Sequence, residues 1–225
     1  MELEVSEWPK GLEKVKPGIK NIFYKGNIGL LSDGRPRLAV VGSRKMTDYG
    51  REIIDRWVPS LVRRGVVIVS GFMYGVDQEA HRVCIEEGGS TIAVLGWGID
   101  RKVARLDENL YQKILESDGL IVSEYPGVTP ARIWTFPQRD RIVVGISDAV
   151  WVVEGALKSG SMITANQATA QGKPLLALPG RVGVNVAEGV NGLIKMGRKS
   201  RNGNGGWRSL RGVGFGSGSV EFGLI

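Results

Sequence analysis

From residue 37 onward the chain alternates short apolar runs with stretches of helical period, and this alternation restricts the fold more than any other feature. Four of the runs contain almost only Val, Ile, Leu and Ala, which is typical of strands covered on both faces. Strands alternating with amphipathic helices predict an α/β fold built on a parallel sheet. The predicted strands are residues 38–41, 66–70, 91–95, 120–122, 149–153 and 175–178. The predicted helices are residues 49–64, 77–87, 108–117, 137–145, 163–171 and 190–196.

The length of 225 residues permits one large domain with its own core. We interpret residues 1–36, which are rich in turn signals, as an extension packed against that core. Residues 37–197 contain the predicted strands and helices and form the main domain. Residues 198–225 contain eight glycines and five basic side chains without any helical or strand period. We expect this tail to be disordered, because it cannot bury enough apolar surface to offset the entropy lost on ordering.

Three turns that contain Gly and Ser each follow an apolar run and precede a helix-like stretch, at residues 42–44, 70–77 and 158–164. In a parallel sheet such turns gather along the edge formed by the carboxyl ends of the strands. Helix N-termini at this edge favour anions, and the turns also carry Arg44 and Lys158. We therefore predict a phosphate site at this edge, although each turn alone is equally compatible with a tight strand-to-helix connection.

The segment 134–141 combines aromatic residues with arginines. Bases of single-stranded nucleic acid stack on aromatic side chains while basic side chains follow the phosphate backbone. A buried Phe136 at a solvated helix start explains the same segment equally well. The candidate phosphate and DNA-binding residues are Gly42, Ser43, Arg44, Phe136, Arg139, Arg141, Lys158, Ser159, Gly160, Ser161 and Thr164.

Two nucleotide-binding motifs are incomplete in this chain. Gly96-Trp97-Gly98 supplies the first two glycines of a dinucleotide-binding motif, but Arg101 occupies the position of the third. The segment 155–162 approaches a P-loop, but Ser161 and Met162 replace its essential Lys and its magnesium-binding Ser or Thr. We therefore expect neither NAD binding nor ATP hydrolysis.

Catalytic and metal-binding side chains are scarce. Ser70, Asp77 and His81 could be drawn as a nucleophilic triad, but a chain with one histidine offers little acid–base chemistry. The simpler interpretation is an Asp at a helix start that interacts with a nearby His. The single cysteine, Cys84, excludes an internal disulfide and a cysteine-based zinc site. We expect no catalytic residues, no cofactor and no metal.

The formal net charge is +7, of which four positive charges belong to the tail. The main domain is therefore only mildly basic, and nucleic-acid binding must be argued from where the charges lie. The N-terminus has neither the basic nor the apolar region of a signal peptide, and no apolar run approaches the ~20 residues that span a bilayer. We expect a cytoplasmic protein with no membrane partner.

From about Trp8 to Gly197 the chain resembles the DNA-processing protein A family (DprA, also called Smf). The first motifs that carry the resemblance are Val41-Gly42-Ser43-Arg44, Ser70-Gly71-x3-Gly75-Val76-Asp77-x2-Ala80-His81-Arg82 and Ser123-Glu124-Tyr125-Pro126-Gly127. The later ones are Phe136-Pro137-x-Arg139-x-Arg141-Ile142, Val152-Val153-Glu154, Ser159-Gly160-Ser161-x2-Thr164-Ala165 and Pro179-Gly180.

The resemblance implies an extended Rossmann-like domain, with a mostly parallel sheet and helices on both faces, that binds single-stranded DNA. It also implies homodimerisation and loading of the recombinase RecA onto incoming DNA during natural transformation. We expect neither a helical accessory domain before residue 1 nor a winged-helix domain after Gly197. Two positions depart from the family pattern. Asp140 replaces the usual Asn between two arginines, and residues 103–107 replace the usual Tyr-Pro-x-x-Asn.

Two other functions remain open from the sequence. Related Rossmann-like phosphoribohydrolases act on nucleoside monophosphates, but the corresponding loop here, residues 158–165, lacks their carboxylate. A small-nucleotide sensor could use the same pocket without catalysis. For the homodimer, the last predicted helix offers an apolar surface that an absent C-terminal domain would leave uncovered. The alternative is that this helix closes the edge of the sheet within one monomer. The candidate dimer residues are Val190, Leu193, Ile194 and Met196.

Overall fold

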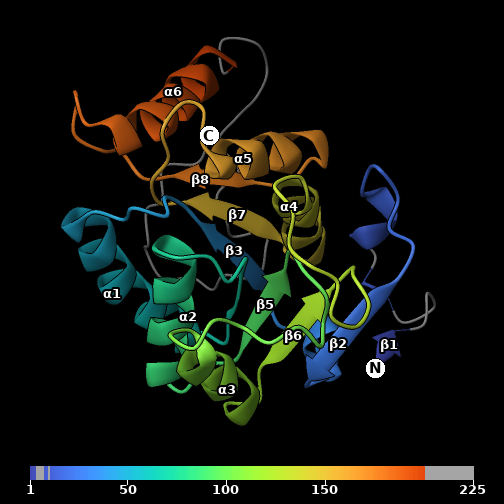
Figure 1. Cartoon of the computed structure of the whole chain (residues 1–225). Helices are drawn as coiled ribbons and strands as arrows, with labels where there is room; N and C mark the ends of the chain where they lie inside the picture. Colours follow the sequence, from blue (N-terminus) through green and yellow to red (C-terminus); the bar gives the residue numbers. More distant parts are fainter. Residues whose placement is uncertain (4–7, 10, 201–225) are drawn as a thin grey trace.

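The structure, a computed structural model, describes residues 1–3, 8, 9 and 11–200 (Figure 1). These residues form an eight-stranded sheet with the strand order β1-β2-β6-β5-β4-β3-β7-β8. The strands are β1 (Glu2–Leu3), β2 (Ile22–Gly26), β3 (Arg37–Val41), β4 (Val67–Ser70), β5 (Thr91–Leu95), β6 (Leu120–Ser123), β7 (Ala149–Val152) and β8 (Leu175–Ala177). From β3 to β8 all neighbouring strands are parallel, which confirms the predicted α/β fold.

Within the described residues, six α-helices connect and cover these strands, and two short 3-10 helices lie in the N-terminal segment. The helices are η2 (Leu12–Lys14), η3 (Ile28–Leu31), α1 (Asp48–Val62), α2 (Val76–Glu86), α3 (Glu108–Glu116), α4 (Thr135–Ile146), α5 (Gly160–Ala170) and α6 (Asn185–Ser200). Each predicted helix is present. In the described part of the chain, no helix combines the length and the apolar composition that crossing a membrane requires.

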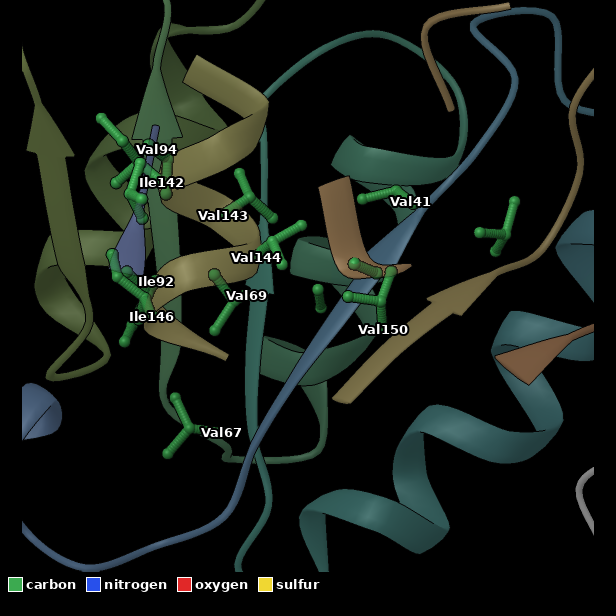
Figure 2. Close-up of a cluster of buried hydrophobic side chains, with 14 of the residues drawn as sticks. Val41, Val67, Val69, Ile92, Val94, Ile142, Val143, Val144, Ile146 and Val150 are labelled. Carbon is green, nitrogen blue, oxygen red and sulfur yellow. The ribbon is translucent and has the colours of Figure 1, made fainter. Parts of the chain in front are cut away.

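Helices cover both faces of the sheet, and the side chains of each strand alternate between them. On β3, Leu38 and Val40 pack with α1 and α2, whereas Ala39 and Val41 point to the side of α4 and α5. Figure 2 shows the second side, where valines from the strands meet Ile142, Val143, Val144 and Ile146 of α4. The apolar runs lack an alternating polar pattern because both faces are buried.

The N-terminal segment extends the sheet in addition to packing against it. β2 pairs antiparallel with β6, in the register Phe23 with Ser123, and β1 pairs antiparallel with β2. Before β2 in the sequence, Leu12 and Val15 are buried in the core cluster that also contains apolar residues of α4. The sequence predicted the packing, but the short and mixed pattern of residues 1–36 did not indicate these two strands.

The predicted dimer residues on the last helix require a correction. α6 begins at Asn185, before the predicted start, and lies over β8. Val190 and Leu193 are buried in the core, and Ile194 is half-buried against it, whereas Met196 is 61% exposed. The apolar stripe of α6 therefore covers the sheet of its own chain. α6 continues through residue 200, three residues into the predicted tail, and residues 201–225 lie outside the described part of the chain.

Candidate phosphate-binding site

The strand order reverses at β3. From β3 the chain moves through α1 to β4 and then outward to β5 and β6, but it returns through α4 to β7 on the opposite side of β3. The turns that follow β3 and β7 therefore leave the sheet edge in different directions. In open α/β sheets, the crevice between two such turns is the usual ligand site. The predicted turns at residues 42–44 and 158–164 lie at this switch point, and the region between them is called the crevice below.

The first turn, residues 42–47, packs closely against the turn that follows β4. An ideal Cβ atom on Gly42 would lie 2.6 Å from Cγ2 of Val76, so only glycine fits there. The Val76 backbone N–H donates a hydrogen bond of 3.2 Å to the Ser43 carbonyl oxygen. The Ser43 hydroxyl accepts a hydrogen bond of 3.0 Å from the Lys45 N–H. Ser43 is therefore held in place by both of its oxygen atoms.

Glu154, at the end of β7, fixes the other end of the first turn. Its buried carboxylate accepts hydrogen bonds from the Thr47 backbone N–H, at 3.0 Å, and from the Thr47 hydroxyl. The Thr47 hydroxyl oxygen in turn accepts the Gly50 N–H at 3.2 Å as the N-cap of α1. Glu154 thus joins the two sides of the crevice. Glu154 belongs to one of the family motifs, but it was not predicted as a site residue.

Arg44 and Phe136 lie together at the mouth of the crevice. The Arg44 side chain is exposed, and its Cζ atom lies 5.3 Å from the centroid of the Phe136 ring. Trp97 contacts the same ring edge to face, with 6.3 Å between centroids. Phe136 is half-buried, which is compatible with both of the roles that the sequence left open.

Arg139 lies beneath this surface and does not reach solvent, with only 3% of its area exposed. Nη1 donates a hydrogen bond of 3.1 Å to the Val94 carbonyl oxygen at the end of β5. Nε lies 3.2 Å from Oδ1 of Asp140, and Nη1 lies 4.0 Å from Oδ2 of Asp77. Arg139 therefore pairs with two carboxylates inside the protein and holds α4 against the ends of β4 and β5.

Burial disfavours the charge on both of these carboxylates. It raises the pKa of Asp140 to about 6, although Arg139, the Thr164 hydroxyl and Arg44 all favour the ionised form. Burial also raises the pKa of Asp77, whose carboxylate accepts the Met73 N–H at 3.3 Å. Asp140 therefore places a titratable negative charge in the electrostatic field of Arg44.

His81 and Ser70 do not form a catalytic pair. Nδ1 of His81 lies 2.7 Å from the Thr91 hydroxyl oxygen, and burial lowers the pKa of His81 to about 3. The Ser70 hydroxyl donates a hydrogen bond of 2.6 Å to the Val40 carbonyl oxygen. Both side chains are fully buried under the turns and serve the fold there.

Arg141 lies apart from the other candidate residues. It is also only 3% exposed, and its Nη2 donates a hydrogen bond of 2.6 Å to Oε1 of Glu124. Its Nε donates to the Pro17 carbonyl oxygen at 3.1 Å, and its Nη1 donates to the Gln138 carbonyl oxygen at 3.0 Å. Arg141 thus attaches the N-terminal segment to α4. The same DNA-binding role was predicted for Arg139 and Arg141, but their side chains point to different sides of α4.

The N-terminus of α5 closes the crevice on the side of β7. Ser159 is its N-cap residue, and the hydroxyl oxygens of Ser159 and Ser161 lie 2.7 Å apart. Lys158 and Gly160 are exposed, whereas Ser161 and Thr164 are buried. The N–H groups of a first helical turn lack carbonyl partners within the helix, so they are suited to an anion. Lys158 and this helix start face the crevice entrance as one candidate anion site.

Comparisons with known proteins agree with this architecture. The family model of DNA recombination-mediator protein A matches residues 2–203. Protein Smf from Escherichia coli is 41% identical over 176 residues, which are 78% of this chain and 46% of the relative. The chain therefore spans about half the length of this relative.

Two solved structures are similar over most of the chain. DNA processing protein A from Streptococcus pneumoniae has a TM-score of 0.81 at 33% identity, over 88% of this chain and 69% of the other. The Helicobacter pylori protein, described for its unique single-stranded DNA binding mode, has a TM-score of 0.79 at 32% identity, over 88% of each chain. The matched residues include the whole sheet and both sides of the crevice, and the chain belongs to the DNA recombination-mediator protein A family.

Proposed function

We propose that this chain binds single-stranded DNA at the crevice between the turns that follow β3 and β7, as a DNA-processing protein of natural transformation. The observation that carries the proposal is the exposed Arg44 guanidinium over the Phe136 ring, beside the start of α5. A cation next to an aromatic ring suits a polymer that alternates phosphates with flat bases. The DNA binding described for the Helicobacter pylori relative supports the same proposal.

Each candidate residue has a role in this proposal that follows from its exposure. Arg44 and Lys158, which are exposed, pair with phosphates, and the backbone N–H groups of the two turns donate hydrogen bonds to phosphate oxygens. Phe136 stacks on a base. The buried Arg139 and Arg141 are positioning residues: Arg139 holds α4 and the carboxylates under the site, and Arg141 holds the N-terminal segment.

The partners of the chain are also proposals. Homodimerisation and the loading of RecA follow from the family resemblance. With Val190 and Leu193 buried, the dimer contact requires other side chains, and we assign it to exposed apolar groups around the outer face of α6. Met196 is exposed there, and Leu157, also exposed, has its Cδ2 atom 3.8 Å from the position of a Cβ on Gly192, one turn before Met196.

We infer a binding function rather than an enzymatic one. His81 is buried with a pKa of about 3 and cannot exchange a proton with a ligand in the crevice near neutral pH. Asp140 lies beside the crevice with a pKa that burial raises to about 6, but its carboxylate pairs with the buried Arg139 inside the protein. A phosphoribohydrolase or a nucleotide sensor would instead use the same anion site for a nucleoside monophosphate.

Competition binding distinguishes these functions. Fluorescence anisotropy of a labelled poly-dT oligonucleotide should show binding that unlabelled single-stranded DNA displaces and that AMP and duplex DNA displace only weakly. Binding should weaken as salt rises, because each neutralised phosphate of a single strand contributes about −0.7 to the log–log slope. Displacement by AMP at concentrations that leave an unlabelled oligonucleotide without effect would contradict the proposal and favour a small-nucleotide site.

A further inference from the structure

We propose that the loops after β5 and β6, residues 97–107 and 125–134, form a second contact surface for single-stranded DNA, which we call the loop surface. This proposal rests on the proposed function and extends it, because the loop surface would bind the part of the strand that leaves the crevice. Three observations carry it: the two loops are joined rigidly, their cations are not used inside the protein, and they adjoin Phe136.

The two loops form one structural unit. Backbone N–H groups of the first loop donate to carbonyl oxygens of the second in three places: Gly98 to Thr129 at 2.9 Å, Ile99 to Tyr125 at 3.0 Å and Asp100 to Gly127 at 2.8 Å. These hydrogen bonds hold the backbones of the two loops together, so that little backbone entropy is lost when a ligand binds.

The cations of the loop surface are available to a ligand. Arg101, Lys102, Arg105 and Arg132 are all exposed, and none of them forms an ion pair with another described residue.

The acidic side chains of the same loops are engaged elsewhere. Asp100 pairs with Lys25 of β2 at 2.9 Å, and the Asp107 carboxylate accepts a hydrogen bond of 2.9 Å from the Gln78 side chain of α2. The hydrogen bond from Gln78 leaves the Asp107 charge in place, but the four exposed cations outnumber it, so the net charge of the loop surface is positive and suits an anionic polymer.

The same two loops also carry exposed apolar groups. Trp134 is 53% exposed and contacts Tyr125 edge to face, with 6.3 Å between the ring centroids. Ile133 and Leu106 are almost fully exposed. An exposed tryptophan held by a second ring provides a face on which a base can stack, and stacking is tolerant of sequence. A strand of DNA satisfies both the cations and the tryptophan, whereas an apolar protein partner would leave the four cations unpaired.

The loop surface is continuous with the crevice. Trp134 precedes Phe136 by two residues, and Trp97, at the start of the first loop, contacts the Phe136 ring at 6.3 Å. Arg44 covers the same ring from the side of the crevice. Phe136 therefore lies between the two surfaces, and a strand stacked on it can pass from Arg44 toward Trp134 without leaving the protein.

The test compares a short and a long oligonucleotide. A dT oligonucleotide of about four nucleotides should occupy the crevice alone, whereas one of about 16 should also reach the loop surface. The triple variant Arg101→Ala, Lys102→Ala, Arg105→Ala should reduce the salt slope of the long oligonucleotide by about 2, from three contacts at about 0.7 each. It should leave the affinity for the short one unchanged.

Trp134 supplies a second measurement. Trp134→Ala should weaken binding of the long oligonucleotide about fivefold or more, as expected for one lost stacking contact. Trp134→Phe, which keeps an aromatic face, should retain most of the affinity. Thermal unfolding of each variant, followed by circular dichroism, should match the unsubstituted protein, because the changed side chains are exposed.

A matched control removes the same charges elsewhere. Lys20, Arg56 and Arg64 are exposed and form no ion pair with another described residue, so changing all three to Ala removes one Lys and two Arg. An equal loss of slope in this control would overturn the loop surface. So would an unchanged slope and affinity in the loop variants while Arg44→Ala still weakens both oligonucleotides. If Arg44→Ala has no effect on either oligonucleotide, the proposed function itself fails.

Discussion

Gly71 lies directly against the guanidinium group of Arg139: a Cβ atom on residue 71 would come within 1.4 Å of Nη1. The turn after β4 can therefore be occupied only by glycine while Arg139 stays in its buried pairs with Asp77 and Asp140. Glycine at position 71 is therefore required for the buried packing of Arg139. The position of the Arg139 side chain on α4 therefore depends on the backbone of the turn after β4.

Gly71→Ala should destabilise the protein strongly. The added methyl group displaces Arg139 and leaves two buried carboxylates without their cation, which typically costs about 3–5 kcal/mol of unfolding free energy. Urea unfolding followed by circular dichroism measures the change. Gly160→Ala is the control, because a Cβ there meets no atom within 4 Å, and its effect should be within about 1 kcal/mol. Equal stability of the two variants would contradict the assigned contact.

Asp140→Asn should stabilise the protein near neutral pH. Burial raises the pKa of Asp140 to about 6, so the folded state holds this proton more tightly than the unfolded chain does. The unfolding free energy should consequently fall as pH rises from about 4 to about 6. The substitution removes this loss and should raise the unfolding free energy at about pH 7.5 on the order of 1–3 kcal/mol, with little gain near pH 4.

Urea unfolding at both pH values checks this prediction, and a gain of the same size at the two would contradict it. The neighbouring charges enter the result as well. The negative charge of Asp77 raises the pKa of Asp140, so removing the Asp77 carboxylate should lower the pKa of Asp140. Because Asp140 lies beside Arg44, Asp140→Asn should bind a dT oligonucleotide more tightly at neutral pH.

Arg44→Ala should weaken single-stranded DNA binding about tenfold or more, as expected for a lost charge-assisted contact to phosphate. The loss should be similar for dT and mixed-sequence oligonucleotides, because phosphate contacts do not specify a sequence. Anisotropy titrations at constant salt measure it. Arg64→Ala, which removes an exposed charge near the end of α1, is the control. An affinity of Arg44→Ala equal to that of the control would refute the assigned contact.

Arg141→Ala should loosen the N-terminal segment without removing the DNA site. The variant loses the hydrogen bond to the Pro17 carbonyl oxygen and leaves the Glu124 carboxylate without its cation. Limited proteolysis should therefore cut residues 11–20 faster than in the unsubstituted protein. Oligonucleotide affinity per folded molecule should stay within about twofold, because Arg141 lies away from the crevice. A large loss of affinity with an unchanged N-terminal segment would reverse the two assignments.

Sedimentation should show a homodimer at micromolar concentration, and Met196→Glu should shift it to a monomer of 24.4 kDa. Met196 is exposed, so this change should leave the fold intact. Leu193→Glu is unsuitable for this purpose, because Leu193 is buried and a charge there should unfold α6 from the core. A dimer that persists in Met196→Glu would move the contact away from α6.

From residue 37 onward, the sequence by itself determined the order of strands and helices along the chain and the edge at which the turns collect, but it did not indicate β1 and β2. Runs such as Leu38–Val41 and Val67–Ser70 needed no knowledge of their neighbours, because an unbroken apolar run separated by amphipathic helices is stable only inside a doubly covered parallel sheet. The turns at residues 42–44 and 158–164 then had to lie on one edge, because parallel strands all end there.

Only the tertiary structure decided which charged and apolar side chains reach the surface. Arg139 and Arg141 are two residues apart on α4, and side chains at this spacing point to different sides of a helix. One enters the carboxylate pair under the crevice, and the other holds the N-terminal segment. The burial of Val190 and Leu193 likewise depends on α6 lying over β8. Contacts between distant segments have no local pattern in the sequence. The sequence therefore determined at which edge of the sheet the site lies, and tertiary packing determined which side chains are exposed there.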